Sequence, residues 1–221
     1  MAEPRGFQYA SPAHEAETAA CGMWLFLGSE MLFFGGLVYV WVVLRMTHPA
    51  GVALGAAHTN LLIGSLNTLL LLTSSLAMTI GVLWAKAGGA QAGGAQAGRG
   101  RAVAWACIAA ALLGAAFLVL KGVEWALDFH EGLFPGPGFA PDGPDAGGAR
   151  LFFSLYFVAT ALHGAHMLVG LGLLAWVARR CWRRGLSVRA VTAVEVVGLY
   201  WSFVDTVWLV LYPLLYVVAR P

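Results

Sequence analysis

Five uninterrupted apolar stretches, each long enough to cross a lipid bilayer, constrain this 221-residue chain more than any other feature. A helix of ~20 apolar residues spans the ~30 Å hydrocarbon core of a membrane. Continuous runs of this kind argue against a transmembrane β-barrel, whose strands alternate apolar and polar residues. We therefore predict an all-α polytopic membrane protein, one membrane domain over residues 1–221, with five transmembrane helices in a bundle at about residues 21–44, 60–84, 102–127, 151–178 and 191–219.

The composition of the whole chain agrees with a membrane protein, because only 11% of the residues are charged, against about 25% in a soluble domain. The segments between the apolar runs look like short connections. The stretch at 86–101 contains the unit GGAQA twice and is predicted to be a flexible Gly/Ala loop. The three cysteines show no paired spacing, so no disulfide framework or zinc site is expected.

The distribution of basic residues predicts the orientation of the chain. Cytoplasmic loops of membrane proteins carry an excess of Lys and Arg. The N-terminal tail and the second and fourth loops hold nine, and the opposite side holds three. The first group is Arg5, Lys86, Arg99, Arg101, Arg179, Arg180, Arg183, Arg184 and Arg189, and the second is Arg45, Arg150 and Arg220. We therefore predict a cytoplasmic N-terminus.

One carboxylate, Glu30, lies inside the first apolar run, in the sequence WLFLGSEMLFFGG. A charge at mid-bilayer costs at least ~2.5 kcal/mol, and the usual responses are protonation, pairing, or facing protein or water. Glu30 is thus a candidate for a buried carboxylate with a proton-related role. The alternative is a neutral Glu that only binds a neighbouring helix.

Polar side chains in the third and fourth runs form two further candidate sites. Lys121 and Glu124 lie three residues apart in KGVEW and should form an ion pair, with contact to lipid or a neighbouring subunit as the functional alternative. His163 and His166 lie on one face of TALHGAHMLVG. From a single helix they cannot be opposite axial ligands of one haem, so we expect no metal and instead a hydrogen bond from histidine to a carboxylate.

The fifth run carries Glu195 near its start and an aromatic face around an acid. Trp201, Asp205, Trp208 and Tyr212 follow spacings of four, three and four residues, which places them on one helix face. Such a face is typical of a helix interface. We expect the indole and phenol groups to donate hydrogen bonds to the Asp205 carboxylate.

Taken together, these motifs resemble subunit III of the haem-copper terminal oxidases. The resemblance rests on SEMLFFGG, LNTLLLLTSS, KGVEW, TALHGAHMLVG and Glu195 ten residues before Asp205 in YWSFVDTVW. It covers all five runs and implies the short, five-helix form of the family, without the first two helices of the seven-helix form. Ser202 stands where the family often has a histidine.

The resemblance implies a non-catalytic subunit of a bacterial cytochrome c or quinol oxidase in the cytoplasmic membrane, which serves aerobic respiration. Such a subunit has no redox centre, so haem and copper belong to the partner subunits. It implies subunit I as the partner, with subunit II in the complex, and bound phospholipid, but no nucleic acid. By position, Glu30 resembles a carbodiimide-reactive carboxylate. Independently of the resemblance, Asp205 is the second candidate for a buried, proton-related carboxylate. The expected lipid or interface contacts are Lys121, Glu124, His163, His166, Glu195, Trp201 and Trp208.

Two other functions fit parts of the sequence. An accessory subunit of a nitric oxide reductase or another respiratory complex would share the apolar pattern. A small proton channel or transporter would explain Glu30, Asp205 and the histidines, but the chain lacks an inverted repeat and mid-membrane helix breaks. The electron donor, cytochrome c or quinol, is determined by other subunits.

Overall fold

Long helices make up nearly all of the structure, a computed structural model that describes residues 12–89, 96–218 and 220. No strand occurs within this part of the chain. The helices are α1 (Pro12–Thr47), α2 (Pro49–His58), α3 (Leu61–Gly89), α4 (Gln96–His130), α5 (Ala146–Arg184) and α6 (Val188–Tyr212), followed by one π-helical turn, η1 (Pro213–Val217).

Five of these helices are long and apolar enough to cross a membrane: α1, α3, α4, α5 and α6 with η1. This confirms the all-α class and the five predicted spans of a multi-pass membrane protein. The helices extend beyond the apolar runs, because helical geometry continues through the polar residues that follow. The predicted Gly/Ala loop at 86–101 is thus helical at 86–89 and 96–101, whereas residues 90–95 lie outside the described residues.

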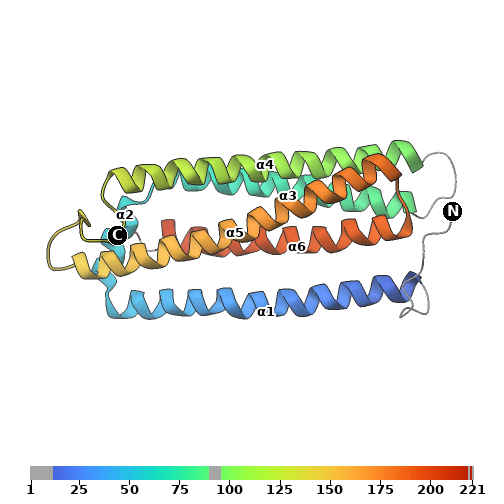
Figure 1. The fold of residues 1–221 in the computed structure, drawn as a ribbon. Coiled ribbons are helices and arrows are strands. Elements are labelled where there is room, and N and C mark those ends of the chain that lie inside the picture. The colour runs from blue at the N-terminus through green and yellow to red at the C-terminus, as the bar shows by residue number, and fades with distance from the viewer. Residues whose placement is uncertain (1–11, 90–95, 219, 221) are drawn as a thin grey trace.

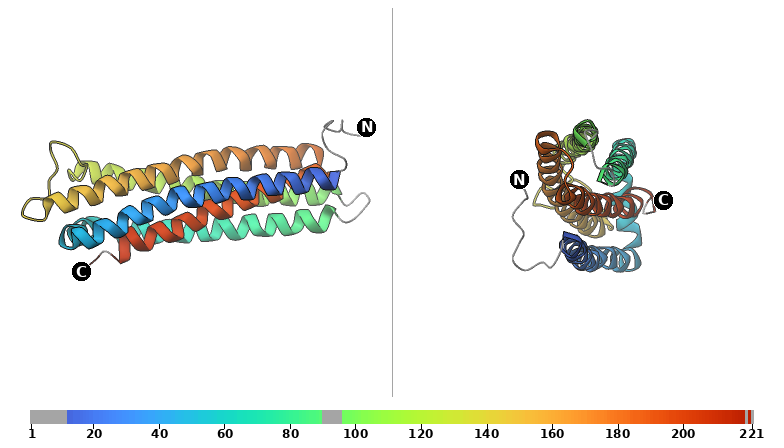
Figure 2. Two further views of the ribbon diagram at one scale, coloured as in Figure 1. Left: turned by 90° about the horizontal axis from the view of Figure 1, so that it is seen from below. Right: turned by 90° about the vertical axis from the view of Figure 1, so that its right-hand side faces the viewer.

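The five long helices run up and down along a common axis (Figures 1 and 2). In the end-on view, α5 and α6 lie between α1 on one side and the α3–α4 pair on the other. α1 contacts α5 and α6, and α3 packs most extensively on α4. The two central helices therefore carry the side chains through which both sides of the bundle meet.

The short helix α2 was not predicted. Pro49 follows the end of α1 and begins α2, where its missing N–H is not needed. α2 packs on the start of α5 at a point where two backbones touch. A Cβ added to Gly51 would lie 2.5 Å from the Cα of Gly148. Only glycine permits this approach.

Apolar side chains cover the outside of the bundle as well as its core. Trp24, Leu25, Leu32 and Tyr39 of α1 are all more than half exposed, whereas Trp201 and Trp208 of α6 are fully buried. A surface of this kind suits lipid tails and neighbouring membrane helices in place of water. The orientation of the N-terminus stays a prediction from the basic residues.

Candidate functional site

Glu30 on α1 and His166 on α5 form the contact that joins the outer helix to the centre of the bundle. Glu30 Oε2 lies 3.0 Å from His166 Nε2, and each side chain is 20% exposed. The ring of Phe34, one turn along α1, packs edge-on against His166 at 5.3 Å between ring centroids. The predicted contact between a histidine and a carboxylate is thus present for His166.

The contact made by the second ring nitrogen of His166 determines how many protons the pair of Glu30 and His166 holds. Its Nδ1 lies 2.8 Å from the carbonyl oxygen of Leu162. A carbonyl only accepts, so Nδ1 carries a hydrogen. Nε2 then either donates to an ionised Glu30 as part of an imidazolium, or accepts from a protonated Glu30. In both states the contact between Glu30 and His166 holds one proton, and the pair is neutral overall.

Two predicted site residues, His163 and Asp205, are buried without hydrogen bonds of normal geometry to the described residues, although the Ser75 hydroxyl of α3 lies near the Asp205 carboxylate. His163 is 1% exposed and Asp205 is 4% exposed. Neither ring nitrogen of His163 and neither carboxylate oxygen of Asp205 has a hydrogen-bond partner among the described residues. The ring of His163 packs instead on Phe117 and Trp208, with centroids 5.5 and 5.3 Å away. Buried polar groups are normally paired, and Asn67 of α3, which is also fully buried, likewise has no hydrogen-bond partner for its side-chain amide among the described residues.

The aromatic face of α6 is present, but its predicted hydrogen bonds to Asp205 were wrong. The indole of Trp201 donates to Ser74 at 3.0 Å, and that of Trp208 donates to Thr68 at 3.0 Å. Each indole has a single N–H, so none remains for the carboxylate. Ser74 in turn donates to the carbonyl of Ala110 at 2.9 Å. The polar side chains of α3 are therefore the partners of α6.

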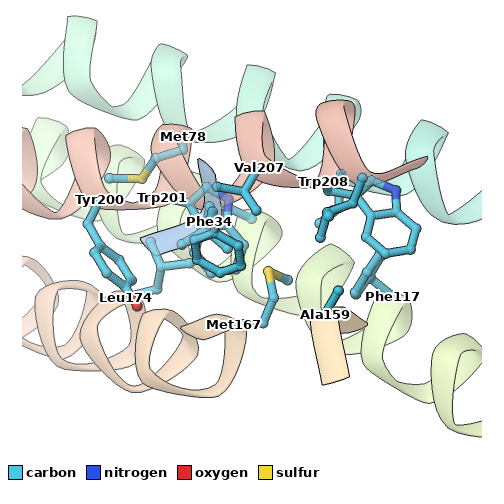
Figure 3. Packing of buried hydrophobic residues seen from close by; sticks show 14 of the residues in the cluster. Phe34, Met78, Phe117, Ala159, Met167, Leu174, Tyr200, Trp201, Val207 and Trp208 are labelled. Atoms are coloured by element: carbon cyan, nitrogen blue, oxygen red, sulfur yellow. The ribbon is translucent and has the colours of Figure 1, made fainter. Parts of the chain in front are cut away.

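These two tryptophans lie in the central apolar cluster. Figure 3 shows side chains from all five long helices meeting there, among them Phe34 of α1, Met78 of α3, Phe117 of α4 and Met167 of α5. Phe117 packs edge-on against Trp208 at 4.8 Å between centroids. Trp201 fits against Gly114 and Gly170, since a Cβ at either position would lie within 3 Å of its ring.

Lys121 and Glu124 form the predicted ion pair, at 3.0 Å between Nζ and Oε2. The structure adds three residues to it, and we call the set the Lys121 cluster: Lys121, Glu124, Asp128, Tyr156 and Tyr216. Lys121 also donates to the hydroxyls of Tyr156 at 2.9 Å and Tyr216 at 2.5 Å. Tyr156 donates to Asp128 at 3.0 Å, and Tyr216 donates to Glu124 at 2.8 Å.

Sequence reasoning missed the three added members of the cluster. Asp128 lies four residues after Glu124, a spacing that places it on the same face of α4. Tyr156 and Tyr216 come from distant parts of the chain, and no local pattern connects them to Lys121. Tyr216 lies in η1, where Pro213 lacks the N–H that would continue α6 as a regular helix.

Glu195 lies at the other end of the bundle, where its Oε1 is 3.6 Å from Nζ of Lys86 on α3. Near that end, α1, α5 and α6 line a groove of about 360 Å³. Its walls are mostly apolar, and its charged lining residues are Glu15, Arg180 and Arg189. Arg189 forms an ion pair with Glu15 at 3.1 Å. The groove thus combines an apolar wall with two guanidinium groups.

Within the described ranges, no group of three or more His, Cys, Asp or Glu side chains comes together as a metal site would require. The functional roles predicted for the individual site residues stay predictions.

The chain was compared with models of protein families and with known proteins. The family model described as cytochrome c oxidase subunit III matches residues 10–220. A cytochrome c oxidase subunit 3 of Thermostichus vulcanus is 31% identical over 210 residues, which is 94% of this chain and 92% of that protein.

Two further relatives carry other names: one is a quinol oxidase subunit, and the other is a combined subunit I+III. The quinol oxidase subunit 3 of Bacillus subtilis is 28% identical over 199 residues, 90% of this chain and 86% of that protein. The heme-copper oxidase subunit I+III of Aeropyrum pernix is 26% identical over 203 residues, which is 89% of this chain but 22% of that protein.

Proposed function

This chain belongs to the cytochrome c oxidase subunit III family and is thus a subunit III of a haem-copper oxidase, and we propose that it is a non-catalytic subunit of a bacterial enzyme. In this role it stabilises the catalytic subunit, supports proton uptake and binds phospholipid in the cytoplasmic membrane. Haem and copper belong to its partners. The observation that carries the proposal is the family match, which extends over nearly the whole chain.

Subunit I is the proposed direct partner. The Aeropyrum pernix relative is named as a subunit I+III, which means that the two subunits are parts of one protein in that case. We propose that the same two subunits are in contact here. The exposed apolar side chains of α1 support such a contact, because a neighbouring membrane helix can cover them. Subunit II completes the proposed complex.

The groove lined by α1, α5 and α6 is the proposed phospholipid site. Its apolar wall suits acyl chains, and Arg180 and Arg189 supply positive charge for an anionic or zwitterionic phosphate. Arg189 is held by Glu15, which positions its guanidinium. Replacing Arg180 by Gln should reduce the amount of phospholipid that co-purifies, measured by mass spectrometry of the extracted complex. Arg150→Gln, at the other end of α5, is the matched control.

The pair of Glu30 and His166 is the proposed proton-related site. The pair holds one proton and lies within two candidate membrane spans, α1 and α5. Each of its side chains is 20% exposed, so lipid or a neighbouring subunit beside α1 can reach it. A partner subunit that docks there would contact the pair directly. Asp205 is the second proposed carboxylate with a proton-related role, since it is buried and neither of its oxygens makes a hydrogen bond of normal geometry to the described residues.

Purification through this chain in mild detergent, followed by optical redox spectra and metal analysis, tests the proposal. Haem together with copper in the co-purifying protein is the expected result. Haem without copper would assign the chain to a nitric oxide reductase. If the chain is isolated colourless and metal-free and conducts protons in liposomes, the proposal is wrong and the chain is a proton channel or transporter.

A further inference from the structure

We propose that the Lys121 cluster is a proton-binding site that takes up its proton on Asp128, at the end of the bundle opposite the Glu195–Lys86 pair. No role in the proposed function above requires such a site. The proposal rests on a count of hydrogens and charges in the cluster, and on which of its oxygen atoms is free to accept a proton.

The hydrogens of the cluster can be assigned from its contacts. Lys121 contacts Glu124 and the two tyrosine hydroxyls at 3.0, 2.9 and 2.5 Å. An ammonium group has three hydrogens, and these three contacts use all of them. Each tyrosine has one hydroxyl hydrogen. Tyr156 gives its hydrogen to Asp128, and Tyr216 gives its hydrogen to Glu124. Both tyrosines are therefore neutral.

This assignment leaves the cluster with one excess negative charge, from two carboxylates and one ammonium. Lys121, Glu124 and Asp128 are 6%, 1% and 4% exposed, and both tyrosines are fully buried. An uncompensated charge in such a site is strongly unfavourable, and a carboxylate usually responds by binding a proton. The cluster therefore has a reason to bind one proton.

The contacts select the atom that receives it. Both oxygens of Glu124 already accept, Oε2 from Lys121 and Oε1 from Tyr216. A proton on Glu124 would displace one of these bonds. Asp128 accepts from Tyr156 only through Oδ2. A proton on Oδ1 of Asp128 thus neutralises the cluster and breaks no hydrogen bond.

The inner border of the cluster shows that it is a binding site and not a path through the bundle. The Trp208 ring lies 5.5 Å from Lys121 Nζ and 5.3 Å from the His163 ring. His163, the next buried acceptor, has no hydrogen-bond partner among the described side chains and backbone groups. Between it and Asp128 lies an ammonium whose hydrogens are all engaged. A proton bound at Asp128 would have to break these bonds and approach a positive charge to go further.

The charged and titratable groups around the cluster come from three elements. α4 contributes Lys121, Glu124 and Asp128, with Glu131 just beyond its end. α5 contributes Tyr156 and His163, and η1 contributes Tyr216. Lys121 is the cation that touches both tyrosines and Glu124. The carboxylate closest in sequence to Asp128 outside the cluster is Glu131, which is exposed and serves as a control.

Infrared difference spectroscopy of the purified full-length chain, in the complex in which it is isolated, tests the proposal. Acidification should produce a C=O stretching band of a protonated carboxyl group. The band should be lost in Asp128→Asn, which keeps an oxygen for Tyr156, and retained in Glu131→Gln. Tyr156→Phe should move the band to higher frequency, because the C=O at Oδ2 loses its hydrogen bond.

An isotope experiment keeps the test valid if a variant fails to fold. Carbon-13 in the side-chain carboxyl of aspartate should shift the wild-type band, and the same label in glutamate should not. Three results would overturn the proposal: a band that survives in Asp128→Asn, a band that follows the glutamate label, or no protonated carboxyl at all. In the last case, exchange of sodium for choline would show whether a cation neutralises the cluster.

Discussion

Glu30 and His166 are 136 residues apart in the chain, yet Glu30 Oε2 lies 3.0 Å from His166 Nε2 in the middle of the bundle. The contact joins α1 to α5, and the helix lengths place it well inside the membrane. Because His166 Nδ1 is engaged with a backbone carbonyl, the two side chains share one proton. Reactivity of Glu30 therefore reports on how that proton is held.

An apolar carbodiimide reacts with protonated carboxyl groups that it reaches through lipid, so it should label Glu30. Glu30→Gln should abolish the labelling, measured by mass spectrometry of peptides. Glu195→Gln is the control, because Glu195 pairs with Lys86 at the end of the bundle. His166→Phe should speed the labelling, since it removes the group that competes for the carboxyl proton. Loss of labelling in His166→Phe would contradict this interpretation.

Ser74 links three helices, because it accepts from Trp201 of α6 and donates to Ala110 of α4. Ser74→Ala leaves the buried indole N–H without an acceptor and should cost about 1 kcal/mol in the membrane. The measurement is the midpoint of thermal unfolding in detergent. Thr73→Val is the control, because that exposed hydroxyl bonds only to its own helix. Equal effects of both substitutions would refute the role of Ser74.

Gly170 lies against the ring of Trp201, and an added Cβ would be 2.8 Å from two ring carbons. Trp201 is fully buried and meets Gly114 on another side, so it cannot move aside. Gly170→Ala should destabilise the fold by about 1 to 3 kcal/mol. Gly172→Ala, two residues on in α5, meets nothing within 4 Å and should be neutral or stabilising. Opposite signs for the two variants are the expected outcome of unfolding assays.

Lys121 neutralises part of a buried anionic cluster. Lys121→Met leaves Glu124 and the tyrosine hydroxyls without their common donor, and should cost about 3 to 5 kcal/mol. The double variant Lys121→Met with Glu124→Gln removes both charges and should recover part of this loss. A double-mutant cycle on thermal unfolding measures the coupling. Additive losses would show that the ion pair contributes nothing beyond the separate side chains.

The predicted spans and the ion pair between Lys121 and Glu124 followed from local rules. A bilayer requires about 20 apolar residues per helix, and side chains three residues apart on a helix meet. Those rules depend only on neighbours in sequence. The short helix α2 escaped them, because ten residues between two spans carry no membrane signal. The predicted helices were also too short, since polar residues continue α4 at both ends, from Gln96 to His130, beyond the predicted range of 102–127.

The hydrogen bonds of the tryptophans show the limit of that reasoning. A helical face places Trp201, Trp208 and Asp205 on one side of α6, but it does not say which helix faces them. The neighbour is α3, whose Ser74 and Thr68 take both indole hydrogens. Asp205 is left without a hydrogen-bond partner among the described residues. Periodicity gives a direction in space, and only packing gives the partner.

The sequence by itself determined the membrane class, the five spans, the family resemblance and the local ion pair, because each depends on composition or short spacing. The tertiary structure decided that His166 and not His163 meets Glu30, and that Tyr156 and Tyr216 join Lys121. These contacts link residues dozens of positions apart. They depend on how the long helices are rotated and displaced against one another, which close packing of the whole bundle determines.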